Sequence, residues 1–184
     1  MTADATLQRV ADLVLIRELQ SRYCRAVDRR DVAVLREVFH PQAHVDKGDG
    51  PVPVDLYLVD VARRHAGIPM SSHQITNVVV DFLPSGDAFS ESYGLAWERR
   101  HDGRGGFVDH SLRVRYGDLL TRHEGEWRVL ERCVVIDQVT SSPATATSDF
   151  DVRGRFFGTR DAEDPVVRMR HEEEEHASSG TRAL

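Results

Sequence analysis

The fold is decided by residues 106–140, which read GFVDHSLRVRYGDLLTRHEGEWRVLERCVVIDQVT. The stretch holds two runs rich in β-branched and aromatic residues with a period of two, Gly106–Arg122 and Glu126–Thr140, and a glycine-containing turn of hairpin length separates them. Two further runs of the same kind, Ser72–Leu83 and Ala88–Arg100, precede it. The pattern predicts a meander of four long antiparallel strands.

The segment before these strands has the 3–4 residue spacing of apolar side chains that is typical of amphipathic helices. We expect helices over residues 7–28, Val32–Phe39 and Val54–His65, and a short strand at Ala43–Asp46. Asp31 is a suitable N-cap for the second helix. Three helices followed by an antiparallel meander predict an α+β fold, with the helices packed on one face of a curved sheet.

The last part of the chain differs in composition. The small-residue segment SSPATATS follows the last strand, and the terminal HEEEEHASSGTRAL is polar and repetitive. A segment of this kind cannot bury enough apolar surface to offset the entropy lost on ordering. We therefore expect one domain over residues 1–140 and a C-terminal extension over residues 141–184, disordered from about residue 170.

The composition excludes several classes of protein. The chain has 184 residues, of which 40% are hydrophobic and 29% charged, with a net charge of −6 and an isoelectric point near 5.8. It lacks the basic face that nucleic-acid binding requires. No apolar run approaches the roughly 18 residues of a spanning helix, and the N-terminus does not resemble a signal peptide. We expect a cytoplasmic protein with no nucleic-acid partner and no membrane association.

Sequence motifs for cofactors and metals are also absent. The chain contains no phosphate-binding loop, no G-x-G-x-x-G, no G-x-S-x-G and no H-E-x-x-H. Two cysteines, Cys24 and Cys133, make neither a disulfide framework nor a four-ligand zinc site. Lys47 is the only lysine, and so the only candidate for Schiff-base chemistry. We expect no metal and no cofactor.

Strand periodicity places several polar side chains on apolar faces. In the third long run, His110, Tyr116 and Asp118 share one face with apolar side chains. In the first long run, His73 and Asn77 share an apolar face. Such groups are either hydrogen-bonded within a core or line a wet pocket, and the pattern leaves both open.

The first helix carries two further candidates, Tyr23 and Asp28, near its end. They lie about 140° apart around the helix, so both can border a wide cavity without sharing a stripe. A carboxylate at a helix C-terminus opposes the helix dipole, which favours a role for Asp28 beyond local stability. The alternative is a solvated carboxylate.

Three stretches together resemble the SnoaL-like branch of the nuclear-transport-factor-2-like superfamily. They are RELQSRYCRAVDRRDVAVLREVFHPQAHVD at 17–46, SSHQITNVVVDF at 71–82 and YGDLLTRHEGEWRVLERCV at 116–134, and the likeness spans about residues 7–140. The resemblance implies a cystatin-like α+β barrel: a cone-shaped, curved antiparallel sheet packed on three N-terminal helices around a deep apolar pocket. It also implies a chain that often dimerises.

The resemblance assigns roles to four residues. Dehydratase and dehydrochlorinase members pair an Asp on the first helix with a His on the following strand, and Asp28 and His73 stand at those positions. Tyr23 matches a tyrosine of the bile-acid dehydratase, and Arg132 matches an arginine that lines the dehydrochlorinase pocket. These four are the expected catalytic residues.

The match is partial at three other positions. A second carboxylate of the bile-acid enzyme falls on Trp97, and an arginine late in its last strand falls on Ile136. Asp118 could correspond to the acidic residue of the polyketide cyclases. We expect Asn77, Trp97, His110 and Asp118 to contact the substrate.

These residues suit cofactor-free acid–base chemistry. Asp28 would fix the tautomer of His73, whose free nitrogen could take a proton from an acidified carbon, with Tyr23 or Arg132 stabilising the enolate. The sequence predicts a dehydratase or isomerase for a hydrophobic cyclic, polyketide-, steroid- or terpenoid-like molecule. The alternative is a non-catalytic small-molecule-binding or dimerisation module. In either case we expect a homodimer that buries Tyr93 and Leu95 on the outer face of the sheet.

Overall fold

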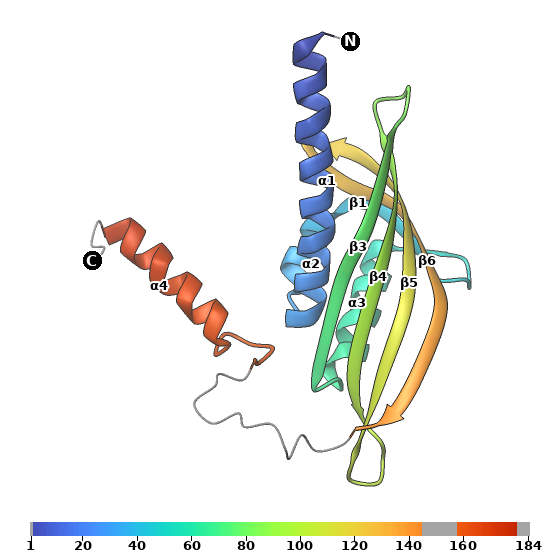
Figure 1. The fold of residues 1–184 in the computed structure, drawn as a ribbon, viewed down its shortest axis with the longest axis vertical. Helices are drawn as coiled ribbons and strands as arrows, with labels where there is room; N and C mark the ends of the chain where they lie inside the picture. Colours follow the sequence, from blue (N-terminus) through green and yellow to red (C-terminus); the bar gives the residue numbers. More distant parts are fainter. Residues whose placement is uncertain (1, 145–157, 180–184) are drawn as a thin grey trace. The chain divides into compact units, whose positions relative to one another are not determined.

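A computed structural model describes residues 2–144 and 158–179 of the chain. The chain divides into two compact units, Met1–Ala144 and Thr145–Leu184. In the first unit, helices lie against one face of a long curved sheet (Figure 1). This is the α+β arrangement that the order of helices and strands predicts, and that prediction is confirmed.

Three helices precede the long strands: α1 (Ala3–Arg29), α2 (Val32–Val38) and α3 (Val54–Ala66). The helix α1 is closed by its C-cap Arg30, whose φ of 57° lies in the left-handed region and turns the chain sharply. The Asp31 carboxylate then accepts a hydrogen bond from the Val34 amide at 3.0 Å, so Asp31 is the N-cap of α2 as predicted. The tight turn directs the last residues of α1 toward the sheet.

The sheet has six strands, in the spatial order β2-β1-β6-β5-β4-β3. They are β1 (Phe39–Asp46), β2 (Pro51–Pro53), β3 (Met70–Phe82), β4 (Ala88–His101), β5 (Phe107–His123) and β6 (Glu126–Pro143). The four-strand antiparallel meander is confirmed, but β1 pairs with β6 in parallel. The expected fold is therefore confirmed, and the sheet as a whole is mixed because of this one parallel pair. Because β1 reaches the sheet from α2 rather than through a hairpin, its direction is not forced to be antiparallel.

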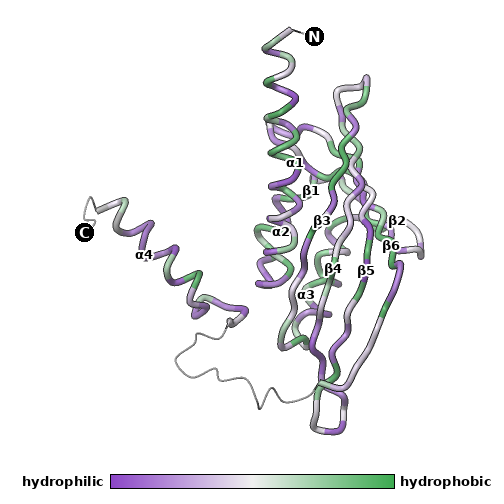
Figure 2. Tube along the Cα trace, viewed as in Figure 1, coloured by the Kyte–Doolittle hydropathy of each residue, from purple (hydrophilic) through white to green (hydrophobic). Residues whose placement is uncertain are grey.

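One face of the sheet is buried and the other is largely exposed. Strand β4 alternates between buried and more exposed positions along most of its length, as a half-buried strand should. The core lies between this inner face and the helices and includes Ile16, Leu35, Phe39 and Leu120, each at most 2% exposed. Hydrophobic and hydrophilic positions recur in turn along the helices and strands (Figure 2).

The second unit contains α4 (Pro165–Ser179), which covers residues expected to be disordered. Helix-favouring local contacts explain the difference: Asp164 accepts a hydrogen bond from the Val166 amide at 3.0 Å, and Arg170 pairs with Glu174 one turn later at 2.8 Å. Residues 145–148 of the predicted small-residue linker lie outside the described part. Among residues 2–144 and 158–179, no helix is both long and apolar enough to cross a membrane.

Candidate functional site

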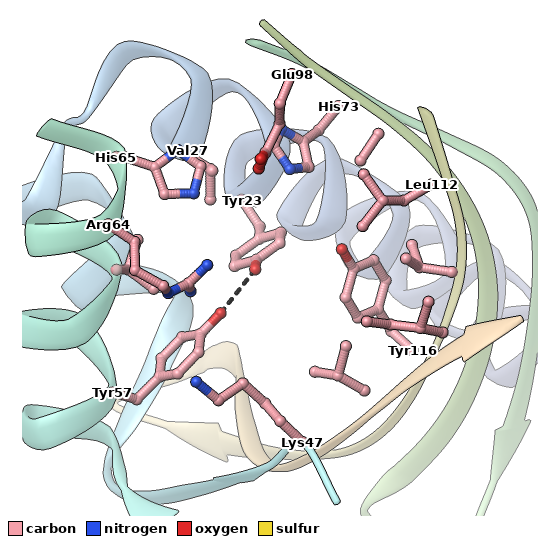
Figure 3. Close-up of a pocket in the computed structure, with 15 residues that line it drawn as sticks. Tyr23, Val27, Lys47, Tyr57, Arg64, His65, His73, Glu98, Leu112 and Tyr116 are labelled. Atoms are coloured by element: carbon pink, nitrogen blue, oxygen red, sulfur yellow. Dashed lines mark hydrogen bonds between the residues drawn. The ribbon is translucent and has the colours of Figure 1, made fainter. Parts of the chain in front are cut away.

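A cavity of about 150 Å³ lies between the inner face of the sheet and helices α1 and α3 (Figure 3). Its walls combine aliphatic side chains from β4, β5 and β6 with polar side chains from the helices and from β3. The lining residues are Tyr23, Val27, Lys47, Tyr57, Val61, Arg64, His65, His73, Ala96, Glu98, Leu112, Val114, Tyr116, Val134 and Ile136.

The most polar contact at the cavity joins Asp28, in the last turn of α1, to His73 on β3. The Asp28 Oδ1 atom lies 2.7 Å from the His73 ring nitrogen Nδ1. The same carboxylate accepts hydrogen bonds at 2.7 Å from the His73 backbone amide and from the Ser71 hydroxyl. Since Nδ1 is engaged by Asp28, the other ring nitrogen, Nε2, is the one available to a ligand.

These hydrogen bonds keep Asp28 ionised. Its side chain is about one-fifth exposed, and this burial alone would raise the pKa of the carboxyl. Hydrogen bonds from the His73 ring, the His73 amide and Ser71 outweigh that effect, so the net pKa lies below its ordinary value. His73 therefore has an anionic partner at neutral pH.

Three tyrosines form the floor of the cavity. The hydroxyl groups of Tyr23 and Tyr57 lie 2.8 Å apart, and the ring of Tyr116 packs edge-on against that of Tyr23. Desolvation raises the pKa of Tyr57 and of Tyr116 well above the ordinary value. Both hydroxyl groups therefore keep their protons and can donate hydrogen bonds to a ligand oxygen.

Glu98 and His65 complete the end of the cavity that holds His73. Glu98 is 7% exposed, and its carboxylate accepts hydrogen bonds from Arg100 at 2.6 and 3.0 Å. The ring of His65, on α3, lies 6.0 Å from that of His73. Figure 3 shows the Glu98 carboxylate beside the His73 ring.

Arg132 and Asp118 lie behind the cavity floor rather than in the wall. Two guanidinium nitrogens of Arg132 donate to the two Asp118 oxygens at 2.7 and 2.8 Å, and both residues are almost fully buried. The guanidinium also lies over the rings of Tyr23 and Tyr116, at 4.2 and 4.7 Å. The expected direct contacts of Arg132 and Asp118 with substrate do not fit this placement. Their charges compensate each other, and Arg132 packs against the Tyr23 ring on the side away from the cavity.

Three other expected contact residues also lie away from the cavity wall. A β-bulge between Ile75 and Val78 shifts the register of β3, so Asn77 is exposed instead of continuing the face of His73. Trp97 lies on the outer face, because the alternation of β4 places its neighbour Glu98 inside. His110 stands opposite Glu98 in the β4–β5 register but bonds to Ser141, beyond the lining residues.

The cavity has polar lining residues that were not among the expected site residues: Lys47, Tyr57, Arg64, His65 and Glu98. A signal existed for Glu98, because the even-numbered positions of β4 from Ala88 to Ala96 are all small and buried, and Glu98 is the next on that face. Tyr57 and Arg64 lie seven residues apart on the predicted third helix, which puts them on one face. Lys47 follows β1 in a turn, and no periodicity indicated that its side chain reaches the cavity.

No group of three or more His, Cys, Asp or Glu side chains in the described residues is arranged to hold a metal ion. The polar groups of the cavity are instead proton donors and acceptors. An imidazole with an anionic partner and a set of neutral hydroxyl donors can move a proton and stabilise a developing oxyanion.

The curved sheet closed by helices defines the class of fold, and the Asp28–His73 pair at its cavity defines the site. Residues 8–133 match the SnoaL-like domain, and the chain belongs to this family of the nuclear-transport-factor-2-like superfamily, as the sequence resemblance predicted. No curated protein matches the chain by sequence.

Solved structures share the fold at low sequence identity. A proposed scytalone dehydratase from Novosphingobium aromaticivorans is 20% identical, with a TM-score of 0.67 over 83% of this chain and 99% of that one. The hexachlorocyclohexane dehydrochlorinase LinA-type3 from Novosphingobium barchaimii is 17% identical, with a TM-score of 0.66 over 83% and 98%. ActVI-ORFA from Streptomyces coelicolor is 17% identical, with a TM-score of 0.56 over 68% and 96%.

Proposed function

We propose that this protein is a cofactor-free enzyme that acts on a hydrophobic cyclic small molecule, either as a lyase of the dehydratase type or as an isomerase. The observation that carries the proposal is the 2.7 Å contact between Asp28 and His73, with the imidazole in the wall of a cavity whose β5 and β6 side is aliphatic. A ligand-binding module has no need of an ionised carboxylate that fixes the tautomer of a cavity histidine.

The proposed reaction begins with removal of a proton from carbon. His73 Nε2 takes a proton from a carbon next to a carbonyl group, and Asp28 stabilises the imidazolium that forms. One hydroxyl group of the Tyr23–Tyr57 pair donates a hydrogen bond to the enolate oxygen while it accepts one from the other. In a dehydratase the imidazolium then gives its proton to the departing hydroxyl group, so that a C–H and a C–OH bond are replaced by a C=C bond and water. In an isomerase the proton returns to a different carbon.

The similar structures support a reaction of this type. One is described as a scytalone dehydratase and another as a hexachlorocyclohexane dehydrochlorinase, and both of those names denote an elimination. The aliphatic wall of the cavity, formed by side chains such as Leu112, Val114 and Val134, suits the apolar ring of a cyclic substrate.

Identification of a bound ligand tests this proposal directly. The ligand that co-purifies with the protein is identified by native mass spectrometry, and candidate substrates related to it are then incubated with the protein. A dehydratase yields a product lighter by one water, and an isomerase yields a product of unchanged mass but different retention. Recovery of every candidate unchanged, despite tight binding, would establish the binding-module alternative.

We also propose that the protein is a homodimer formed through the outer face of the sheet. Phe89, Tyr93 and Leu95 on β4 are each 43–44% exposed there, and they form an apolar stripe along one strand. We expect light scattering to give a dimer mass, and Leu95→Arg to give a monomer because it buries an unpaired charge. Leu56→Arg, at an exposed position on α3, is the control and should remain dimeric. A monomeric wild-type protein at micromolar concentration contradicts this assembly.

A further inference from the structure

The cavity is electrostatically polarised along its length. One end holds His73 with the carboxylates of Asp28 and Glu98, and the other holds the cationic side chains of Lys47 and Arg64. Figure 3 shows Glu98 and His73 together, with Lys47 beside the Tyr57 ring at the other edge of the cavity and the Arg64 guanidinium directed toward the tyrosine hydroxyl groups. A neutral apolar substrate would make no favourable electrostatic contact with these two cations.

The cations at this end outnumber the carboxylate that holds them. Asp60, on α3, accepts hydrogen bonds from Lys47 and Arg64 at 2.9 Å and from Arg63 at 2.8 Å. These hydrogen bonds outweigh partial desolvation and lower the pKa of Asp60 far below its ordinary value. Within the described residues every ion pair of these three cations goes to Asp60, so the group keeps two uncompensated positive charges.

Asp60 also leaves donors free to contact a ligand. Arg64 uses Nε for Asp60, and in the described part of the chain its terminal nitrogens have no hydrogen-bond partner. The Lys47 ammonium lies 5.9 Å from the centre of the Tyr57 ring, at the cavity wall. An ammonium and a planar guanidinium held side by side are suited to a carboxylate.

We infer that the substrate is a small cyclic carboxylic acid, whose carboxylate is held by Lys47 and Arg64 while its reacting carbon faces His73. The inference rests on the proposed function and adds the substrate class. A volume near 150 Å³ accommodates about one six-membered ring, which leaves the charged group at the cationic end. Glu98 is paired with Arg100 and presents only acceptor oxygens, which disfavours a ligand carboxylate at the opposite end, and the ligand therefore binds in one orientation.

Binding of benzoate and benzamide, two probes of nearly equal size that differ in charge, tests the inference. By calorimetry near neutral pH, we expect benzoate to bind about tenfold more tightly than benzamide, the effect of one charge-assisted contact. Lys47→Met and Arg64→Met should each abolish most of this preference, measured as the ratio of the benzoate and benzamide affinities of each variant. Arg63→Met is the matched control, because Arg63 pairs with the same Asp60 but does not line the cavity.

Three results would overturn the inference: no binding of benzoate, equal affinity for the two probes, or an equal loss in Lys47→Met and Arg63→Met. The assay is independent of the chemistry, since His73→Ala should still prefer benzoate. If the protein shows no preference for benzoate but His73 is required for turnover, only the inferred substrate class is wrong. If the protein prefers benzoate but His73 is not required for turnover, only the proposed reaction is wrong.

Discussion

Alanine in place of His73 is expected to lower turnover of the identified substrate by about 10²–10⁴-fold, the usual contribution of a general base. The Asp28 carboxylate binds Nδ1 at 2.7 Å and so leaves Nε2 as the only nitrogen that can take the proton. Removing the ring removes this acceptor. Initial rates at saturating substrate measure the effect, and His101→Ala, at the exposed end of β4, is the control that should retain full activity.

Asp28→Asn should lower turnover by a similar factor, because an amide at this position can leave the imidazole in the wrong tautomer. If the two residues act as a unit, the double variant will be little slower than either single variant. Circular dichroism establishes that each variant is folded, since Asp28 also accepts hydrogen bonds from Ser71 and from the His73 amide. Full activity of His73→Ala would show that the proton acceptor lies elsewhere.

The overall fold could be predicted because the signals that determine it are local. The four long strands follow from a period of two interrupted by glycine-containing turns, and Asp31 could be placed as an N-cap because capping depends on the residues just after it. The parallel pairing of β1 with β6 joins residues almost ninety positions apart, such as Val45 and Arg132. No local pattern specifies such a contact.

The site could be predicted only where the strand pattern continued without interruption. His73 lies before the bulge of β3, so its expected inward direction agrees with its place in the cavity wall. Asn77 lies within the bulge, and one inserted residue reverses the face of everything beyond it. The expectation for Trp97 comes from the family resemblance rather than from the strand pattern, and the regular alternation of β4 directs its neighbour Glu98 inward and Trp97 outward.

The sequence could predict that a charged residue lies on a buried face, but not which residue it pairs with. The alternation of the third long run placed Asp118 on an apolar face, and the family resemblance indicated Arg132. Their pairing is set by the β5–β6 register, in which they stand directly opposite each other. A buried ion pair and two separate substrate contacts make different predictions about stability.

Alanine in place of Asp118 is expected to lower the free energy of unfolding by about 3–5 kcal/mol, since it leaves the Arg132 guanidinium buried without its counter-ion. Both residues are at most 2% exposed, and burial opposes the charged form of Arg132. Asp118 outweighs that effect and holds the pKa of Arg132 well above its ordinary value. Urea unfolding measures the loss, which is a large fraction of the total stability of a domain of this size.

A matched pair on the same two strands serves as the control. Arg115 on β5 and Asp137 on β6 also form a two-pronged ion pair, but on the exposed outer face, so Asp137→Ala should cost far less than Asp118→Ala. Equal losses in the two variants would contradict the argument from burial.

The double variant Asp118→Leu with Arg132→Met separates the stability of this pair from its effect on the cavity. Replacing both charges with apolar side chains of similar size removes the unpaired ion, so we expect most of the lost stability to return. The cation that lies over the Tyr23 and Tyr116 rings is then gone, while the Asp28–His73 pair remains. If Arg132 acts by holding Tyr23 in place, turnover stays low in this stable variant. If turnover returns with stability, Arg132 and Asp118 serve the fold alone.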